Sequence, residues 1–538
     1  RWLRQTCGVD SVTLVGARIG AAIAARAACA IDGIEALIMV SPVASGRRFL
    51  RELVLAAHTN AEIWQVEPRI DDGMWFEAHG LRLDRVTRNA LQRLDVANLP
   101  SCPAPNVLVL DSPDSASARS LVRRLGSTGA QVTQVSDPVL AAMLRDSHEN
   151  EVPHEAFAQA VAWHAALNPS DAQCHGGVTL PAAQSAVLAL DTSTERPLWF
   201  GPDHALLGVL CEPTRAAPDA PVVLIANTGA NPRYGNSRAA VTVARWLATL
   251  GVPSLRIDGT GIGDSLPQTG ERGLPYSLQG DADLQAGIDA LTARFSGPVI
   301  VLGMCSGAYH ALRGAFQDTR IRGLMLLNLQ KFVWRDGESL SVVQRTTLRT
   351  TRFYMRNAIS GATLRRLLRG DINVAGISKG LAGRAGRRVA AACDPAIRML
   401  QRKETPVGRV RRQVRELAAR SVQILFILSG NDPGLDEIAE YFGAQGRMFR
   451  RLPNVTYQTL EGADHTLSAN WARQALMQRI AVYLNRYFDV PIPMERAEVA
   501  APRAVCRQPD PSLESDCFVQ PGVFAQSVAI ATGASHAG

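Results

Sequence analysis

The chain has 538 residues, 46% of them apolar and 20% charged, and its formal net charge is +8. This length exceeds one ordinary hydrophobic core, so we expect two domains, and the composition excludes a disordered or collagen-like chain. No run of 18 apolar residues occurs, so no membrane-spanning helix is predicted. The nine cysteines include no C-x-x-C pair. We therefore expect no metal site and no cofactor, and reduced thiols in a cytoplasmic protein.

Residues 1–165 are expected to form a first domain. An apolar strand at 11–15 leads into Gly16-Ala-Arg-Ile-Gly20 and an alanine-rich helix, which is the strand, G-x-X-x-G, helix pattern of a nucleophile elbow. The tip residue is Arg18, which stays protonated and cannot be a nucleophile. Strands at 36–40 and 106–110, an acid after the second strand and His154 complete the order of the back half of an α/β-hydrolase. We interpret this domain as partial and inactive, with its front strands expected before residue 1 and His154 an ordinary helix-start residue.

Residues 166–190 are rich in Pro, Gly and small polar residues and are predicted to be a linker, with Cys174-His175 in a solvated loop. Residues 191–490 are expected to form the second domain. Residues 491–538 have weak periodicity and are predicted to be a disordered tail.

The second domain alternates predicted strands and helices, which indicates a mostly parallel sheet flanked by helices. A hairpin is predicted around Gly201-Pro-Asp203. Gly259, Gly261 and Gly263 do not have the spacing of a dinucleotide fingerprint, so a glycine-rich loop beside a cleft is the better interpretation. The predicted strands of this domain lie at 198–200, 206–210, 222–226, 253–257, 299–302, 323–327, 422–428 and 454–460, and its main helices are predicted at 281–295 and 470–487.

The stretch 299–312 predicts a nucleophile elbow. Four apolar residues lead into Gly303-Met-Cys-Ser-Gly307, and a helix follows. Cys305 stands at the tip, where other elbows carry serine, and Ser306 is one residue too late for the spacing. The Ser306 hydroxyl is expected to cap the helix, and His310, one turn into the helix, is expected to be packed.

Three residues follow the order nucleophile, acid, base along the chain, namely Cys305, Asp432 and His465. His465 is the candidate base and Asp432 the candidate orienting acid, because each follows a predicted strand at the edge of the sheet. Asp436 is a rival for the acid, and Asp464 is expected to make local hydrogen bonds. The oxyanion donors are expected to be the backbone N–H groups of Ser306 and of Thr228 or Gly229; this last pair lies in the loop after the strand at 222–226.

These sequence motifs resemble those of the α/β-hydrolase superfamily. Residues 191–490 are similar to its serine-aminopeptidase-like lineage through Gly303-Met-Cys-Ser-Gly307, Gly430-Asn-Asp-Pro433 and Gly462-Ala-Asp-His465. Residues 1–165 resemble hydrolases associated with exosortase and exopolysaccharide systems through Gly16-Ala-Arg-Ile-Gly20 and the segment 41–49. The resemblance implies tandem α/β-hydrolase domains, the first incomplete, and acyl-transfer chemistry. Cysteine in place of serine, as in dienelactone-hydrolase-like members, departs from the peptidase pattern.

Residues 331–420 are predicted to form a basic helical cap over the second domain. They carry 21 Lys and Arg against 6 Asp and Glu, a net charge of +15. Such a cap would concentrate an anionic substrate, for example an acyl group on a phosphopantetheine carrier. The alternatives are a solvated charged face and peripheral contact with anionic lipids. No nucleic-acid partner is expected, because no nucleic-acid-binding motif accompanies the charge.

The sequence therefore predicts a hydrolase of ester or thioester bonds with a Cys-His-Asp triad, acting in exopolysaccharide metabolism. The alternatives are an acyltransferase on a polysaccharide or carrier-bound acyl group, and a non-catalytic scaffold of a polysaccharide-export system. The substrate and the oligomeric state are not predicted.

Overall fold

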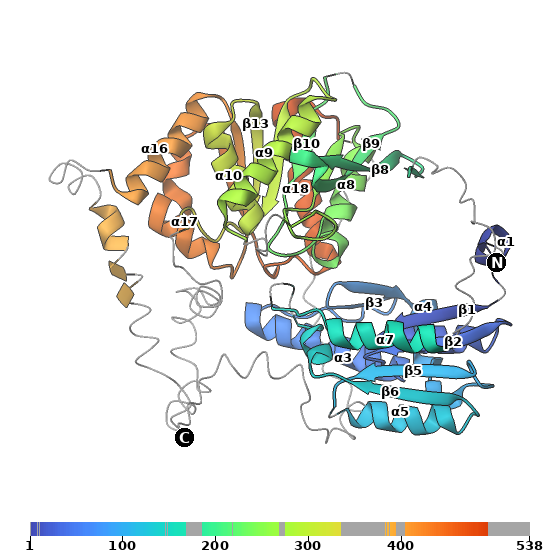
Figure 1. Cartoon of the computed structure of the whole chain (residues 1–538). Coiled ribbons are helices and arrows are strands. Elements are labelled where there is room, and N and C mark those ends of the chain that lie inside the picture. The colour runs from blue at the N-terminus through green and yellow to red at the C-terminus, as the bar shows by residue number, and fades with distance from the viewer. Residues whose placement is uncertain are drawn as a thin grey trace, which may run out of the picture. The chain divides into compact units, whose positions relative to one another are not determined.

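The computed structural model describes residues 2–7, 9, 11–113, 115–145, 147, 149–167, 186–217, 219–267, 275–334, 382–383, 385–386, 388–393 and 404–492. These residues divide into two compact units (Figure 1). The first unit takes its described residues from Arg1–Thr59 and Arg69–Ser185, and the second from Asn60–Pro68 and Ala186–Cys517.

The first unit is built on a parallel sheet with the strand order β1-β2-β5-β6. Helices α2 and α5 cover one face of this sheet, and α6 and α7 cover the other, because their alanine and leucine side chains belong to two separate apolar clusters. The elements of this unit are α1 (Trp2–Cys7), β1 (Val12–Ala17), α2 (Ile19–Ala28), β2 (Ile34–Val40), α3 (Gly46–Trp64), β3 (Trp75–Ala78), β4 (Leu81–Asp84), α4 (Arg85–Arg93), β5 (Asn106–Asp111), α5 (Ala116–Gly126), β6 (Gln131–Ser136), α6 (Val139–Ala142) and α7 (His154–Leu167). The end of α3, from Asn60 on, is counted with the second unit.

The second unit is built on a nine-stranded sheet with the order β15-β14-β13-β12-β10-β11-β9-β8-β7. The six strands from β15 to β11 in this order run parallel, and β9, β8 and β7 continue the sheet with antiparallel pairings. The strands are β7 (Leu188–Ala189), β8 (Ser193–Phe200), β9 (Leu206–Pro213), β10 (Val222–Ile225), β11 (Ser254–Ile257), β12 (Val299–Met304), β13 (Ile321–Leu327), β14 (Gln423–Ser429) and β15 (Val455–Leu460).

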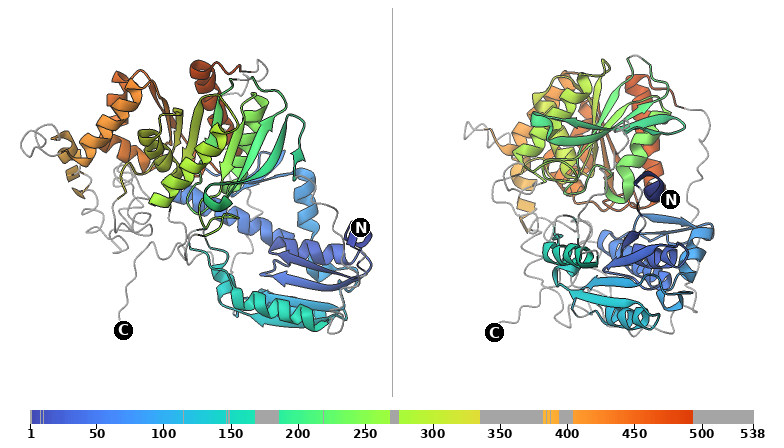
Figure 2. Two further views of the ribbon diagram at one scale, coloured as in Figure 1. Left: turned by 45° about the horizontal axis from the view of Figure 1, so that its top comes forward. Right: turned by 45° about the vertical axis from the view of Figure 1, so that its right-hand side comes forward.

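Helices cover both faces of this second sheet (Figure 2). Successive side chains of a strand point to opposite faces, so each buried strand contributes to both layers. One layer contains α8 (Ala239–Thr249) and α18 (Asn470–Phe488). The other contains α9 (Leu278–Thr292), α10 (Ser306–Gln317), α16 (Pro406–Ala419) and α17 (Gly434–Phe442).

The predicted strands and helices of the second domain are confirmed, with boundaries shifted by a few residues. The hairpin prediction is also correct, since β8 and β9 pair directly across the turn at Pro202–His204. One part of the linker prediction is wrong. Leu188–Ala189, inside the expected linker, pairs with β8 as strand β7, because its backbone reaches the open edge of β8.

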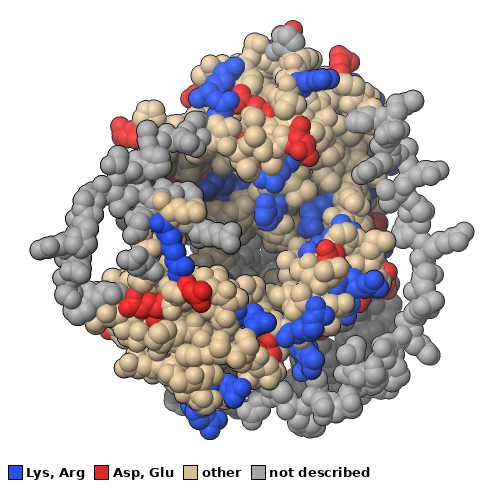
Figure 3. Space-filling view, turned by 90° about the vertical axis from the view of Figure 1, so that its right-hand side faces the viewer, with Lys and Arg blue, Asp and Glu red and all other residues tan. Residues whose placement is uncertain are grey.

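The remaining linker residues 168–185, Cys174-His175 among them, and the tail from residue 493 lie outside the described residues. Most of the predicted cap lies outside them as well. Within its described part, Arg412 on α16 pairs with Glu404 at 2.8 Å and with Glu416 at 2.7 Å, and the Arg411 guanidinium donates to the Tyr441 carbonyl at 2.5 Å. On the face shown in Figure 3, described Lys and Arg side chains are interspersed with Asp and Glu.

Candidate active site

Cys305 lies between β12 and α10 in a backbone conformation that residues other than glycine rarely adopt, with φ 55° and ψ −114°. Such conformations cost about 1–3 kcal/mol and persist only where the surroundings impose them. The turn is tight, because a Cβ added at Gly303 would lie 2.2 Å from the Gly307 carbonyl oxygen. The Cys305 N–H donates to the Leu327 carbonyl at 2.9 Å, which attaches the turn to β13. The thiol is therefore presented at the carboxyl edge of the sheet.

Two predicted partners meet at the same edge of the sheet. His465 lies in the loop between β15 and α18, and its Nδ1 is 2.5 Å from Oδ2 of Asp432, which follows β14. The other Asp432 oxygen, Oδ1, accepts the Gly434 N–H at 2.7 Å. The Asp432 side chain is completely buried and that of His465 is 12% exposed. The structure therefore brings together a carboxylate and an imidazole that are 33 residues apart in sequence.

Cys305 is a further group close enough to act on His465. Burial by itself lowers the pKa of His465, but the charges of Asp432 and Cys305 and the hydrogen bond with Asp432 outweigh burial, so the pKa is raised well above its usual value. The side-chain amide of Gln330 lies 3.2 Å from Nδ1 on the same ring. The arrangement favours a protonated His465 ring between a carboxylate and a sulfur. Such an imidazolium can donate its proton in catalysis.

The other two acids near this edge make different contacts. Asp436 lies on α17, and its Oδ1 pairs with Arg388 at 2.6 Å. Asp464 accepts the Ser468 N–H at 2.8 Å and the Thr466 hydroxyl at 3.1 Å, so it holds the loop that carries His465. Of the two candidate acids, the structure gives Asp432 the contact with His465.

The loop of residues 227–231, called the 227–231 loop below, lies against the elbow. The Gly229 N–H donates to the Ser306 hydroxyl at 2.8 Å, so the expectation that this hydroxyl caps α10 is wrong. The hydroxyl turns toward the loop because the loop amide is within its reach, whereas the residue at the N-cap is Cys305. A Cβ at Gly307 would lie 2.5 Å from the Asn227 carbonyl oxygen, and Thr228 bridges to Asn231 within the loop. The 227–231 loop and the start of α10, which carry the predicted oxyanion donors, are therefore in close backbone contact.

Tyr276 was not predicted and lies beside the thiol. Its hydroxyl is 3.7 Å from Cys305 Sγ. Its ring stacks on Trp334 with centroids 4.5 Å apart and 3° between planes, and meets Tyr309 edge-on at 5.1 Å. Burial first, and then the charge of Cys305 and the hydrogen bond with it, raise the pKa of the Tyr276 phenol well above its usual value. The phenol is therefore held protonated beside the sulfur and is able to donate to it.

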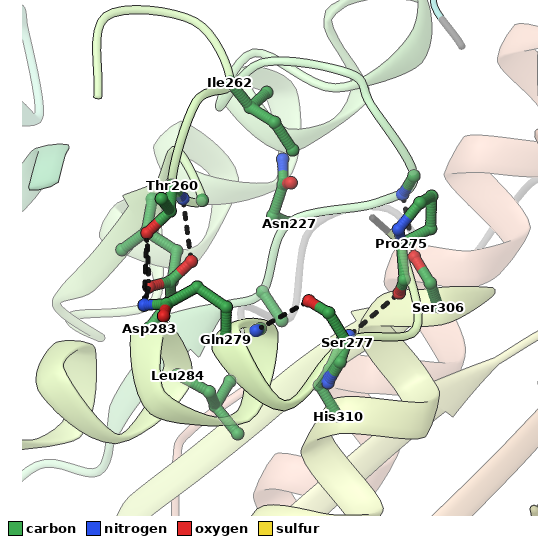
Figure 4. Close-up of a pocket in the computed structure, with 15 residues that line it drawn as sticks. Asn227, Thr260, Ile262, Pro275, Ser277, Gln279, Asp283, Leu284, Ser306 and His310 are labelled. Atoms are coloured by element: carbon green, nitrogen blue, oxygen red, sulfur yellow. Dashed lines mark hydrogen bonds between the residues drawn. The ribbon is translucent and has the colours of Figure 1, made fainter. Parts of the chain in front are cut away.

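A small pocket adjoins the elbow through Ser306 (Figure 4). His310 lies on its wall and is packed, as expected. Its Nδ1 is 2.7 Å from Asp281 and its Nε2 is 2.8 Å from the Pro275 carbonyl, next to Tyr276. Across the pocket the buried Asp283 accepts the Thr260 N–H and hydroxyl and the Gln279 amide. Gly259 of the glycine-rich loop also lines this pocket. His310 thus fixes the Pro275 carbonyl next to Tyr276, and Asp283 holds the glycine-rich loop at Thr260.

The first unit has the same strand, turn and helix arrangement, with Arg18 at the tip. Arg18, between β1 and α2, has φ 51° and ψ −126°, close to the values at Cys305. Its guanidinium pairs with Glu52 at 2.6 Å, and its N–H donates to the Val40 carbonyl at 3.0 Å. Asp111 ends β5, and His154 is an exposed residue at the start of α7. Arginine at the tip supplies no nucleophile.

The strand order, the elbow and the residues after β14 and β15 define an α/β-hydrolase fold for the second unit. Residues 234–478 match the family model described as the Alpha/beta hydrolase family, and this match supports a hydrolase. A search of curated proteins gave no match to this sequence.

Several solved structures are similar to part of the chain. A cold-adapted esterase from an Arctic intertidal metagenomic library is 15% identical with a TM-score of 0.31, over 57% of this chain and 99% of that chain. A dienelactone hydrolase from Anabaena variabilis is 15% identical with a TM-score of 0.30, over 56% and 97%. An alpha-beta serine hydrolase homologue from Coxiella burnetii is 11% identical with a TM-score of 0.29, over 56% and 98%.

Within the ranges that the structure describes, none of the helices is both long enough and apolar enough to span a membrane. In the same ranges, no three His, Cys, Asp or Glu side chains are grouped as ligands of a metal ion.

Proposed function

We propose that the second unit hydrolyses ester or thioester bonds, with Cys305 as nucleophile, His465 as general acid and base, and Asp432 orienting His465. The observation that carries the proposal is the convergence at one sheet edge: His465 lies 2.5 Å from Asp432 and close enough to the elbow cysteine Cys305 for that residue to raise its pKa. Nucleophile, base and orienting acid within hydrogen-bond reach are the signature of nucleophilic catalysis.

In the first stage the Cys305 thiolate attacks the substrate carbonyl carbon. The carbonyl oxygen becomes an oxyanion, for which the backbone N–H groups of Ser306 and Gly229 are the proposed donors, with Thr228 beside them. The Gly229 N–H, which donates to the Ser306 hydroxyl in this structure, would transfer its hydrogen bond to the oxyanion. The tetrahedral intermediate collapses, the His465 imidazolium gives its proton to the leaving alkoxide or thiolate, and an acyl-Cys305 thioester remains.

In the second stage neutral His465 takes a proton from water, and the resulting hydroxide attacks the acyl carbon. The Cys305 thiolate leaves, the carboxylic acid is released, and His465 is again the imidazolium. An alcohol in place of water would give acyl transfer by the same steps. Because the first unit resembles exopolysaccharide-associated hydrolases, we propose a carbohydrate ester as one source of the substrate, and a sugar hydroxyl as the acceptor if the enzyme transfers the acyl group.

We propose that the first unit has no hydrolytic activity of its own, because the elbow residue Arg18 is ion-paired with Glu52. A scaffold role for the whole chain would require that Cys305 also be inactive, and labelling of this thiol separates the two ideas.

The test uses the full chain with p-nitrophenyl acetate and with an acetyl thioester. Cys305→Ala is expected to lower kcat/KM at least 10³-fold, because it removes the nucleophile. Cys393→Ala is the matched control, since Cys393 is an exposed thiol outside the site, and its activity should stay within about twofold of the unchanged chain. Iodoacetamide should label Cys305 faster than Cys393 by peptide mapping. Equal turnover by the unchanged chain and Cys305→Ala would refute the proposal. Sorbitol added as acceptor distinguishes transfer, which yields acyl-sorbitol, from hydrolysis.

A further inference from the structure

A second pocket lies between the sheet and the α8 and α18 layer. It encloses about 680 Å³ of empty space, counting the part open to solvent. Most of its wall is apolar. The apolar wall residues are Ile225, Ala226, Pro232, Ala239, Ala240, Val243, Ile257, Leu302, Met304, Leu327, Leu467 and Leu476.

This pocket, called the apolar pocket below, adjoins the candidate active site along the chain. Three of its wall residues are direct neighbours of site residues: Met304 precedes Cys305, Thr466 follows His465, and Thr228 precedes Gly229. The wall of the apolar pocket therefore begins directly beside the elbow, the loop that carries His465 and the 227–231 loop.

The charged residues in the wall are engaged by the protein. Arg233 pairs with Asp258 and, at 2.6 Å, with Asp264, and its N–H donates to Asp258 at 2.5 Å. Burial lowers the pKa of the Arg233 guanidinium, but these carboxylates outweigh burial and raise it. The Arg473 guanidinium donates to the carbonyl oxygens of Leu467 and Ser468. Arg233 is thus paired with carboxylates and Arg473 is hydrogen-bonded to the backbone, and the rest of the wall favours an apolar occupant.

We propose that the apolar pocket binds the acyl chain of the substrate, and that this chain is a saturated hydrocarbon of several carbons rather than acetyl. The inference rests on the proposed function and deepens it by naming the substrate class. The acyl side is the better fit, because the leaving groups considered above, a carbohydrate or a phosphopantetheine thiol, are polar. Each methylene moved from water into such a pocket is worth roughly a fourfold gain in binding.

The first test compares acetyl, butyryl, hexanoyl and octanoyl p-nitrophenyl esters. We expect kcat/KM to rise roughly fourfold per methylene until the pocket is filled. Two isomers then separate the acyl side from the alcohol side, since ethyl octanoate and octyl acetate contain the same atoms. Preference for ethyl octanoate supports the inference, and preference for octyl acetate overturns it.

The second test blocks the pocket. Ala240→Trp places a large ring in the wall from α8, and should lower the octanoyl-to-acetyl ratio of kcat/KM by at least tenfold. Thr242→Trp is the matched control, because Thr242 is exposed on the same helix, and it should leave the ratio unchanged. Ala239→Phe serves if Ala240→Trp does not fold. An unchanged ratio in a folded Ala240→Trp or Ala239→Phe protein overturns the inference.

A third measurement does not require turnover. Calorimetric titration of Cys305→Ala with octanoate should show binding at least tenfold tighter than with acetate, and Ala240→Trp in that background should abolish the difference. If the chain hydrolyses no ester but binds octanoate in this way, the pocket inference stands and the proposed function fails. If it hydrolyses acetyl and octanoyl esters equally, the proposed function stands and the pocket inference fails.

Discussion

Replacing Asp432 with asparagine tests the carboxylate on which the proposed proton transfer depends. Both Asp432 oxygens accept hydrogen bonds, one from the Gly434 N–H at 2.7 Å and one at His465 Nδ1, 2.5 Å away. An asparagine side chain has only one acceptor oxygen. If that oxygen keeps the Gly434 N–H, the amide NH₂ faces Nδ1, which then must accept, and the ring proton moves to Nε2. This tautomer cannot take a proton at the nitrogen that faces the thiol.

The expected loss of kcat/KM in Asp432→Asn comes from the missing carboxylate charge as well as from the changed tautomer of His465. A carboxylate and an imidazolium about 4 Å apart at an effective dielectric constant near 20 attract by about 4 kcal/mol, which is an upper limit for what asparagine removes. Since about 1.4 kcal/mol is tenfold in rate, we expect kcat/KM to fall between about 10²- and 10³-fold. Asp432 is also one of the groups that raise the pKa of His465. In Asp432→Asn that pKa falls, so the imidazolium is lost at lower pH and the alkaline limb of the rate profile moves to lower pH.

The assay is hydrolysis of p-nitrophenyl butyrate between pH 5 and pH 10, with thermal unfolding as a check on folding. Asp436→Asn is the control, because Asp436 pairs with Arg388 on the neighbouring helix and not with His465. Loss of activity in Asp436→Asn together with near-normal activity in Asp432→Asn would refute the assignment of the acid.

Two further predictions concern groups outside the proposed triad. Tyr276→Phe removes the hydroxyl 3.7 Å from Cys305 Sγ while keeping the ring stack. We expect kcat and the rate of Cys305 alkylation to fall about tenfold with KM unchanged, since a hydrogen bond to an ionised group is worth about 1.5–3 kcal/mol. Equal alkylation rates in Tyr276→Phe and the unchanged chain would contradict this. Glu195→Gln tests a buried ion pair in the second unit: burial raises the Glu195 pKa, but Arg245 and Arg256 outweigh it and lower the pKa to about 2 from 4.5. That stabilisation is present above pH 4.5 and is lost as pH falls toward 2, so urea unfolding between pH 2 and pH 7 should show a steep acid loss in the unchanged chain and a flatter curve in Glu195→Gln.

The elements around the sheet could be predicted because their signals are local. Short apolar runs gave the parallel strands, and two glycines around Cys305 gave the elbow, since only glycine tolerates a carbonyl oxygen 2.2 Å from where Cβ would lie. Asp432 and His465 could be named because each follows a strand, and the carboxyl ends of parallel strands meet at one edge.

The contacts that depend on side-chain reach could not be predicted. Tyr276 precedes α9 in a loop without a motif, and it reaches Cys305 only because His310 and Asp281 hold the Pro275 carbonyl beside it. A tyrosine just before the helix-capping Ser277 was the only signal in the sequence. The Ser306 hydroxyl bonds to a loop 77 residues earlier, a tertiary contact that overrides the local preference of serine for helix capping.

The paired elbows have a consequence for how such sites are recognised. Arg18 and Cys305 hold nearly the same unfavourable dihedral angles, although only one of them can attack a carbonyl. Arginine offers no nucleophilic atom, so the distortion at Arg18 does not depend on a nucleophile and comes from the connection between strand and helix. A bent backbone at this position therefore identifies the fold, and the chemistry depends on the side chain at its tip.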